Sequence, residues 1–214
     1  ISESYRKGKI SESRLSSSVK KILSLKSKSN LKNYQKISSN NILAKVNTSK
    51  DTLLYAKAME SSITLIKNNK SILPLSNDKK YLHVAFGKND NGDYLFNKIN
   101  KYLELDSYSS QDFTPLYSKT DYDAIIISYH SSSSSPYASN IIPPEIVANI
   151  NKISRNNNIV LNLFLNPYSL NSFNSIDDFE SIVIGYQNNI ISQEITADLL
   201  FGIRSFKGKI PVSN

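Results

Sequence analysis

The chain has 214 residues, of which 39% are hydrophobic, a formal net charge of +8 and no cysteine. This length allows a substantial hydrophobic core and predicts one domain with an appendage. The absence of cysteine excludes disulfides and thiolate metal sites, and no apolar run approaches the roughly 20 residues of a membrane-spanning helix. The N-terminal sequence ISESYRKGKI has neither an initiator Met nor the apolar core of a signal peptide, so we expect the natural chain to begin upstream.

The positive charge belongs to the first segment of the chain. Residues 1–50 hold twelve Lys or Arg and two Asp or Glu, whereas residues 51–214 hold fourteen and sixteen. Clustered cations can bind the phosphates of a nucleic acid. They are also typical of a solvated helix face followed by a Lys-rich linker. Only Tyr5 and Tyr34 are interleaved with these cations, too few for a base-stacking platform, so we expect no nucleic-acid partner.

The first predicted element is a helix within residues 8–26. Four apolar residues recur there at helical spacing and would form one stripe, and Ser11 or Ser13 is suited to the N-cap. The stripe consists of Leu15, Val19, Ile22 and Leu23. Such a stripe needs an apolar surface, so we expect this helix to dock on the rest of the chain or on a second copy.

A linker and a second helix follow. Residues 27–50 are rich in Ser, Asn and Lys and predict a linker, so we divide the chain into residues 1–50 and 51–214. Helical spacing resumes over residues 51–67, and Pro74 prevents any further helix. The face that we expect this helix to bury consists of Leu54, Ala58, Ser61 or Ser62, and Leu65.

From residue 81 onward, apolar runs alternate with amphipathic stretches. The predicted strands are residues 81–86, 105–109 (weak), 123–128, 158–165 and 180–186; the predicted helices are 93–103, 143–153 and 191–201. Apolar strands separated by helices imply a mainly parallel sheet that is covered on both faces. The expected fold class is therefore α/β: a three-layer sandwich of about five or six strands, flavodoxin-like in outline, centred on 123–128 and 158–165.

Ligands of open parallel sheets bind beyond the carboxyl ends of the strands. Three loops qualify: residues 87–93, 129–140 and 166–173. None carries a GxGxxG or P-loop pattern, and no spacing suggests metal ligands, so we expect neither a cofactor nor a metal.

The candidate residues on these loops for the rim of a binding site are Asn89, Asp90, His130 and Tyr137. The alternative is that they belong to ordinary solvated loops. His83 lies inside an apolar run, where a histidine is more often a hydrogen-bonded core residue.

Three stretches resemble glycoside hydrolase family 3. YRKGKISESRLSSSVKKILSLK (5–26) is similar to the helix that closes the catalytic barrel of that family. AMESSITLIKNNKSILPL (58–75) resembles the entry into its second domain. ADLLFGIRSFKGKIPVS (197–213) resembles the LFG and G-K-L-P-V-S motifs that end this domain, with Ile210 in place of Leu. The resemblance implies the C-terminal α/β sandwich domain of a longer enzyme, ending on an extended edge piece at Lys209–Val212, with Gly202 as a left-handed helix cap.

The resemblance also implies what the parent enzyme does. Family members are retaining glycosidases whose carboxylate nucleophile lies on a (β/α)8 barrel, which has no counterpart in this sequence. Many β-glucosidase members supply the acid/base Glu from the second domain, in a loop that reads G-E-x-P-Y-x-E. Here Pro136 and Tyr137 match that loop, but Ser139 stands where the Glu would fall. The β-N-acetylglucosaminidase branch takes its acid/base from a barrel loop, so the parent is expected to belong to that branch.

The resemblance therefore predicts a domain that is inactive alone and serves as a scaffold and possible rim of a sugar site. Its expected partners are the N-terminal barrel of the same chain, a further C-terminal module and carbohydrate in the parent, which we expect in the periplasm or outside the cell. Two alternatives remain open: a spacer or interaction module of a multidomain protein, and an independent flavodoxin-like binder of small ligands.

Overall fold

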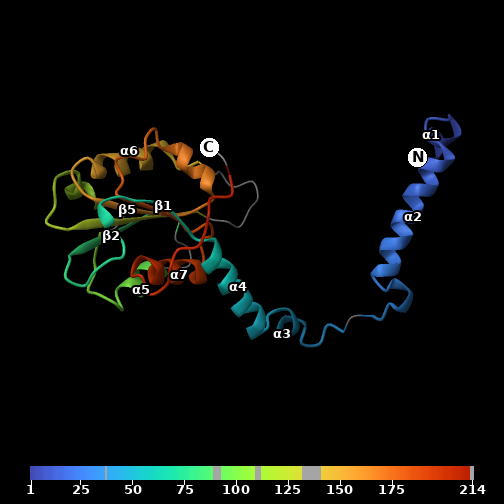
Figure 1. Ribbon diagram of the computed structural model, residues 1–214, viewed down its shortest axis with the longest axis horizontal. Helices are drawn as coiled ribbons and strands as arrows, with labels where there is room; N and C mark the ends of the chain where they lie inside the picture. The colour runs from blue at the N-terminus through green and yellow to red at the C-terminus, as the bar shows by residue number, and fades with distance from the viewer. Residues whose placement is uncertain (37, 89–92, 109–111, 132–140, 213–214) are drawn as a thin grey trace. The chain divides into compact units, whose positions relative to one another are not determined.

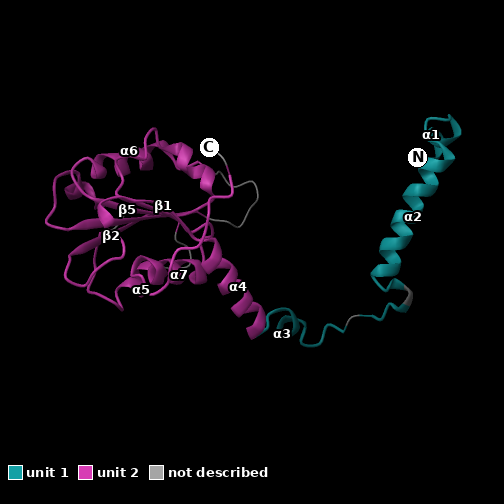
Figure 2. Cartoon of the chain, in the orientation of Figure 1, with its two compact units in different colours: residues 1–48 teal, residues 49–214 magenta. Residues whose placement is uncertain are grey.

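The computed structural model describes residues 1–214 except 37, 89–92, 109–111, 132–140 and 213–214. The chain divides into two compact units, Ile1–Thr48 and Ser49–Asn214, which are coloured separately in Figure 2. Among the described residues, no helix is both long and apolar enough to cross a lipid bilayer.

The first unit is helical. Its elements are α1 (Ser2–Arg6), α2 (Glu12–Lys28), the 3-10 helix η1 (Leu31–Asn33) and α3 (Ile42–Val46). Ser11 caps α2, because its Oγ accepts a hydrogen bond of 3.2 Å from the Arg14 backbone N–H, so the predicted helix and its cap are confirmed. Within this unit three of the four stripe residues are exposed, since Val19, Ile22 and Leu23 are 45%, 53% and 58% exposed, whereas Leu15 is half-buried.

The second unit contains a six-stranded sheet in the order β1-β6-β5-β4-β2-β3. All neighbouring strands are parallel except β1 and β6, which are antiparallel. The strands are β1 (Thr64–Asn68), β2 (Tyr81–Gly87), β3 (Asp106–Tyr108), β4 (Ala124–His130), β5 (Ile159–Phe164) and β6 (Ser181–Ile184). The expected mainly parallel sheet of five or six strands, with β4 and β5 at its centre, is confirmed.

Helices cover both faces of the sheet (Figure 1). Helix α6 (Pro144–Ser154) packs on one face, and α4 (Ser49–Ser62), α5 (Tyr94–Ile99) and α7 (Ile190–Leu200) pack on the other. The described residues of the second unit also form the 3-10 helices η2 (Asn69–Ser71), η3 (Thr114–Tyr117) and η4 (Pro167–Ser172), and η4 lies between β5 and β6. The predicted three-layer α/β sandwich is therefore confirmed.

Local sequence explains the central elements. β4 carries three consecutive isoleucines, and every residue of β4 and β5 is buried, as expected for central strands of a parallel sheet with two covered faces. Helix α6 begins with Pro144, whose missing N–H costs nothing in a first helical turn. Its buried residues Val147, Ile150 and Ile153 recur every three positions and face the sheet.

The predicted helix over 51–67 is too long, and its buried face is wrong. Helix α4 ends at Ser62, and the chain continues as the edge strand β1. The buried residue of α4 is Met59, with Tyr55 and Ala56 half-buried, whereas Leu54 is 66% exposed. The Tyr55–Met59 face packs with the apolar residues of α7, so the helix is rotated by one position from the predicted face.

Two other expectations need correction. The helix predicted over 93–103 spans only Tyr94–Ile99. The expected extended edge piece at Lys209–Val212 forms no strand, although Ile210 packs against the core on the α6 side of the sheet.

Gly202 closes α7 as predicted. It adopts a left-handed backbone with φ of +70°, and its N–H donates to the Leu199 carbonyl while the Ile203 N–H donates to the Asp198 carbonyl. These two bonds form a Schellman motif, which favours glycine at this position.

Candidate functional site

The carboxyl edge of the parallel strands carries the loops that hold the candidate residues. β2 ends at Gly87 and β4 ends at His130, and these two residues are paired in register. Of the four candidates, Asn89, Asp90 and Tyr137 lie outside the described residues. Their expected clustering with His130 on one face stays a prediction.

His130 is completely buried at this edge. Its ring stacks on Phe164 with the centroids 4.9 Å apart. Its Nε2 lies 2.8 Å from Ser128 Oγ, and its Nδ1 lies 2.9 Å from Asn188 Oδ1. Protein therefore surrounds the imidazole, which packs inside the domain beneath the loops and does not line an open surface.

Ser128 joins His130 to the second histidine. His83 Nε2 lies 2.9 Å from the same Ser128 Oγ, and His83 is 2% exposed. Ser128 and His130 are two positions apart on β4 and therefore share a face of the sheet. The expectation that His83 is a hydrogen-bonded core residue is confirmed. Sequence reasoning missed the link between the histidines, whose only signal is this alternation in two neighbouring strands.

Asp93 lies next to His83, on the side of the ring away from Ser128. One carboxylate oxygen, Oδ1, accepts the Phe96 N–H at 2.9 Å and caps α5. The other oxygen, Oδ2, lies 3.3 Å from His83 Nδ1. Both oxygens of Asp93 are thus engaged by described groups.

Asn188 lies next to His130, in the turn between β6 and α7. Its Nδ2 donates to the Lys88 carbonyl oxygen at 3.1 Å, and its Oδ1 accepts from Gln193 Nε2 at 2.8 Å. Gln193 in turn accepts the Leu95 N–H through Oε1 at 3.0 Å. Asn188 therefore connects the ends of β2 and β4 with the start of α7.

Burial dominates the electrostatics of both imidazoles. It lowers the pKa of His83 to about 4; the Asp93 carboxylate opposes this shift, and His130 adds to it. Burial also lowers the pKa of His130, against opposing effects of the Asn188 hydrogen bond and of Asp93. The free energy that an imidazolium loses on leaving water exceeds the favourable interaction with one carboxylate. Both rings are therefore neutral at pH 7.

The β6–α7 turn that presents Asn188 has an unusual backbone. Tyr186 has φ of +61°, which is rare for a bulky residue and is often found near functional sites. Its hydroxyl lies 2.9 Å from Thr64 Oγ1. The preceding Gly185 is required by packing, because a Cβ there would lie 2.6 Å from the Phe164 ring.

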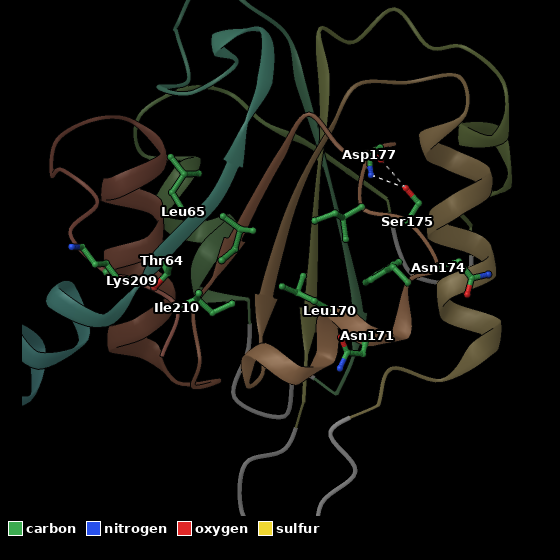
Figure 3. A pocket seen from close by; sticks show the side chains of 13 residues that line it. Thr64, Leu65, Leu170, Asn171, Asn174, Ser175, Asp177, Lys209 and Ile210 are labelled. Carbon is green, nitrogen blue, oxygen red and sulfur yellow. Dashed lines mark hydrogen bonds between the residues drawn. The ribbon is translucent and has the colours of Figure 1, made fainter. Parts of the chain in front are cut away.

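A pocket of about 670 Å³ lies on the α6 side of the sheet, beside β1 (Figure 3). It is found where η4 and the loop after it connect β5 to β6. Its floor is apolar, and Asn171, Asn174, Ser175 and Lys209 add polar groups. The predicted ligand loop 166–173 contributes three lining residues, Leu170, Asn171 and Phe173.

Among the described residues, neither the pocket nor the group around His83 and His130 contains two carboxylates. Glycoside hydrolysis uses two catalytic groups, usually carboxylates, on either side of the glycosidic bond. Asp177 is the single carboxylate among the described residues of the pocket. Among the described side chains hydrogen-bonded or ion-paired with the two histidines, Asp93 is the single carboxylate. Within the described ranges, no three His, Cys, Asp or Glu side chains are grouped to hold a metal ion.

Solved structures with the same fold cover nearly the whole chain. A family 3 β-N-acetylglucosaminidase from Paenibacillus is 17% identical, with a TM-score of 0.62 over 98% of this chain and 41% of its own. A β-glucoside phosphorylase is 21% identical, with a TM-score of 0.64 over 99% and 40%. A β-glucosidase from Listeria innocua is 16% identical, with a TM-score of 0.63 over 99% and 34%. This chain has the fold of part of a family 3 glycoside hydrolase.

The matches extend over both compact units, and the chain spans less than half the length of each of these three enzymes. At identities of 16–21% the likeness concerns the fold. No protein-family model and no curated protein matches the sequence.

Proposed function

We propose that this chain is a non-catalytic α/β domain of a family 3 glycoside hydrolase. The observation that carries the proposal is the agreement in fold over 98–99% of the chain with enzymes more than twice its length. The three resembling motifs lie within the matched region. The domain would then work with a (β/α)8 barrel of the same polypeptide, which supplies the nucleophile.

The parent enzyme in this proposal is a retaining β-N-acetylglucosaminidase that acts on carbohydrate or on glycans derived from cell walls. Similar folds occur both in a β-N-acetylglucosaminidase and in enzymes of β-glucosides, so the choice of branch rests on the sequence. Ser139 stands where the β-glucosidase loop has its acid/base Glu. A serine hydroxyl cannot donate a proton as that carboxylic acid does.

The role of the domain in the proposal is that of a scaffold and a rim for the sugar site. Asn89, Asp90 and Tyr137 would contribute polar groups at the carboxyl edge, where ligands of parallel sheets bind. His130 would act from beneath, because its ring is buried and bonded to Ser128 and Asn188.

An activity assay tests the proposal. The purified chain and its full-length parent are compared on chromogenic N-acetyl-β-glucosaminide and β-glucoside. We expect no turnover by the chain alone and turnover of the N-acetylglucosaminide by the parent. Turnover by the chain that is abolished by His130→Gln or Ser139→Ala would show an active site in this domain and contradict the non-catalytic role. Preference of the parent for the β-glucoside would refute the proposed branch and leave the fold unchanged.

Kinetics of the parent test the rim. Tyr137→Phe and Asn89→Ala should raise KM for long glycans more than for short chromogenic substrates, because a rim contacts only the distal part of the substrate. Tyr168→Phe is a control, since Tyr168 is 56% exposed on η4 and is not among the rim residues. Unchanged kinetics for both substrate lengths would indicate ordinary solvated loops.

A further inference from the structure

The hydrogen-bond pattern around the two buried histidines determines which of their nitrogens carry protons. At one end, two backbone groups orient the amides. The Leu95 N–H requires an acceptor, so Gln193 presents Oε1 to it and Nε2 to Asn188. The Lys88 carbonyl requires a donor, so Asn188 presents Nδ2 to it. Asn188 Oδ1 therefore faces His130 Nδ1, and this nitrogen must carry a proton.

The same reasoning applies at the other end. Asp93 Oδ1 accepts the Phe96 N–H, and the remaining oxygen Oδ2 faces His83 Nδ1 at 3.3 Å. A carboxylate is only an acceptor, so His83 also carries its proton on Nδ1. In a neutral imidazole the other nitrogen, Nε2, is then a bare acceptor.

Both Nε2 atoms face one hydroxyl. His83 Nε2 lies 2.9 Å and His130 Nε2 lies 2.8 Å from Ser128 Oγ. A serine hydroxyl has one proton to donate and can accept further hydrogen bonds. With both rings neutral, one of the two contacts has no proton between its heavy atoms, in a site where an unmade hydrogen bond is costly.

One additional proton supplies the hydrogen bond that is missing at Ser128. If it binds His83 Nε2, this nitrogen donates to Ser128 Oγ, and the hydroxyl donates to His130 Nε2. Transfer of the first proton to Oγ, with transfer of the hydroxyl proton to His130, gives the mirror arrangement without net change in charge. A second proton would leave the hydroxyl without an acceptor and place two imidazolium ions around it.

We propose that His83, Ser128 and His130 form a relay that binds a single shared proton and, on binding it, completes the hydrogen bonds from His83 through to Asn188, with the Asp93 carboxylate at ion-pair distance from His83. The positions involved are Asp93 before α5, the end of β4 and Asn188 before α7. The relay is a pH-responsive element of the fold and does not depend on the proposed glycosidase parent.

The groups that face the relay support a single protonation. Among the described residues, Asp93 is the charged group that acts on both rings. Helix α7 presents the neutral Gln193, and α5 presents Phe96, whose ring centroid lies 5.8 Å from that of His83. β5 presents the uncharged Phe164 and Asn162. One carboxylate can balance one imidazolium, whereas a second would be buried without a counter-charge.

Nitrogen NMR of the two imidazoles in the intact chain tests the relay as the pH is lowered from 8 through and below the His83 pKa of about 4. At pH 8 we expect both rings to carry their proton on Nδ1. On acidification we expect both rings to respond together in one step, with uptake of one proton in total. A proton on Nε2 of either neutral ring, or uptake of two protons in separate steps, would overturn the proposal.

Two variants isolate the hydroxyl. Ser128→Ala should uncouple the rings, so that each titrates alone, and Ser154→Ala is the matched control because Ser154 is a buried serine of α6 that bonds to the Asn151 carbonyl. Coupled titration that persists in Ser128→Ala would contradict the relay. If this variant does not fold, Ser128→Thr retains a hydroxyl and should retain the coupling, and the proton positions in the unchanged chain remain decisive.

Discussion

Helix α2 of the first unit and helix α7 of the second differ in how their apolar residues are covered. Helix α2 has 17 residues with an apolar stripe, and none of them is buried. Helix α7 has 11 residues, and eight of them are buried. An amphipathic helix needs an apolar surface along one stripe, whereas α7 is enclosed on most sides, by packing of its apolar residues and by hydrogen bonds of its polar ones. The buried residues that stabilise the fold therefore lie in residues 49–214. The stripe of α2 is expected to need an apolar partner surface.

The largest expected effect separates the two units directly. Ile127→Ala removes a fully buried side chain of β4 and should lower the free energy of unfolding by about 2–5 kcal/mol. Ile22→Ala is the matched change in α2, where the side chain is 53% exposed, and it should cost less because less apolar surface is lost from a buried position. Urea unfolding followed by circular dichroism measures both. Similar losses would show that α2 contributes to the same core.

Acid should weaken the second unit through His83. Its pKa is about 4 in the folded chain against 6.5 without the fold, so on acidification the unfolded chain binds a proton that the folded chain refuses. The free energy of unfolding should therefore fall by about 2 kcal/mol from pH 7 to pH 5 because of this residue. Urea titrations at several pH values measure the slope. His83→Gln should reduce it, and an identical slope in this variant would contradict the assigned cause.

Two glycines with positive φ give a smaller contrast. Gly202→Ala places a side chain in the left-handed region and should cost about 1 kcal/mol or more, and its Cβ would also lie 3.0 Å from Pro74 Cβ. Gly8 has φ of +66° in the first unit, with nothing within 4 Å of an added Cβ. Gly8→Ala should leave the thermal unfolding of residues 49–214 unchanged. A lower midpoint in both variants would mean that the units unfold together.

The smallest expected effect on global stability concerns the stripe of α2. Each of its side chains, if buried on a partner surface, stabilises by at most on the order of 1.5–3 kcal/mol. We expect amides of residues 12–28 to exchange slowly, because the helix docks on its own chain or on a second copy. Ile22→Ser with Leu23→Ser should remove this protection, because both substitutions replace apolar groups of the stripe by hydroxyls. Fast exchange throughout α2 in the unchanged chain would contradict docking.

Much of the fold was predictable because the central strands are continuous apolar runs. β2, β4 and β5 are buried on both faces, and short continuous apolar runs are typical of such central strands in a parallel sheet. β1 was missed, since Thr64–Asn68 contains a lysine and an asparagine and pairs with β6 more than 100 positions along the chain. The face of α4 was assigned one position away, because Leu65, which belongs to β1, had been counted in the helical pattern.

The candidate site was less predictable than the fold. His130 was placed at the end of β4 from the sequence, but its burial depends on Phe164 and Asn188, which come from other elements. The pairing of His83 with Ser128 depends on the register between β2 and β4, which the sequence does not specify alone. Asn188 was not recognised, since an asparagine in a turn is common and only the fold brings it to the histidine.

The coding sequence upstream of Ile1 tests the central claim most directly, because a family 3 α/β domain works with a barrel on the same polypeptide. We predict an open reading frame that continues upstream into a (β/α)8 barrel with a carboxylate nucleophile. An upstream reading frame too short to encode a barrel, or one that encodes a different domain, would contradict the proposed function.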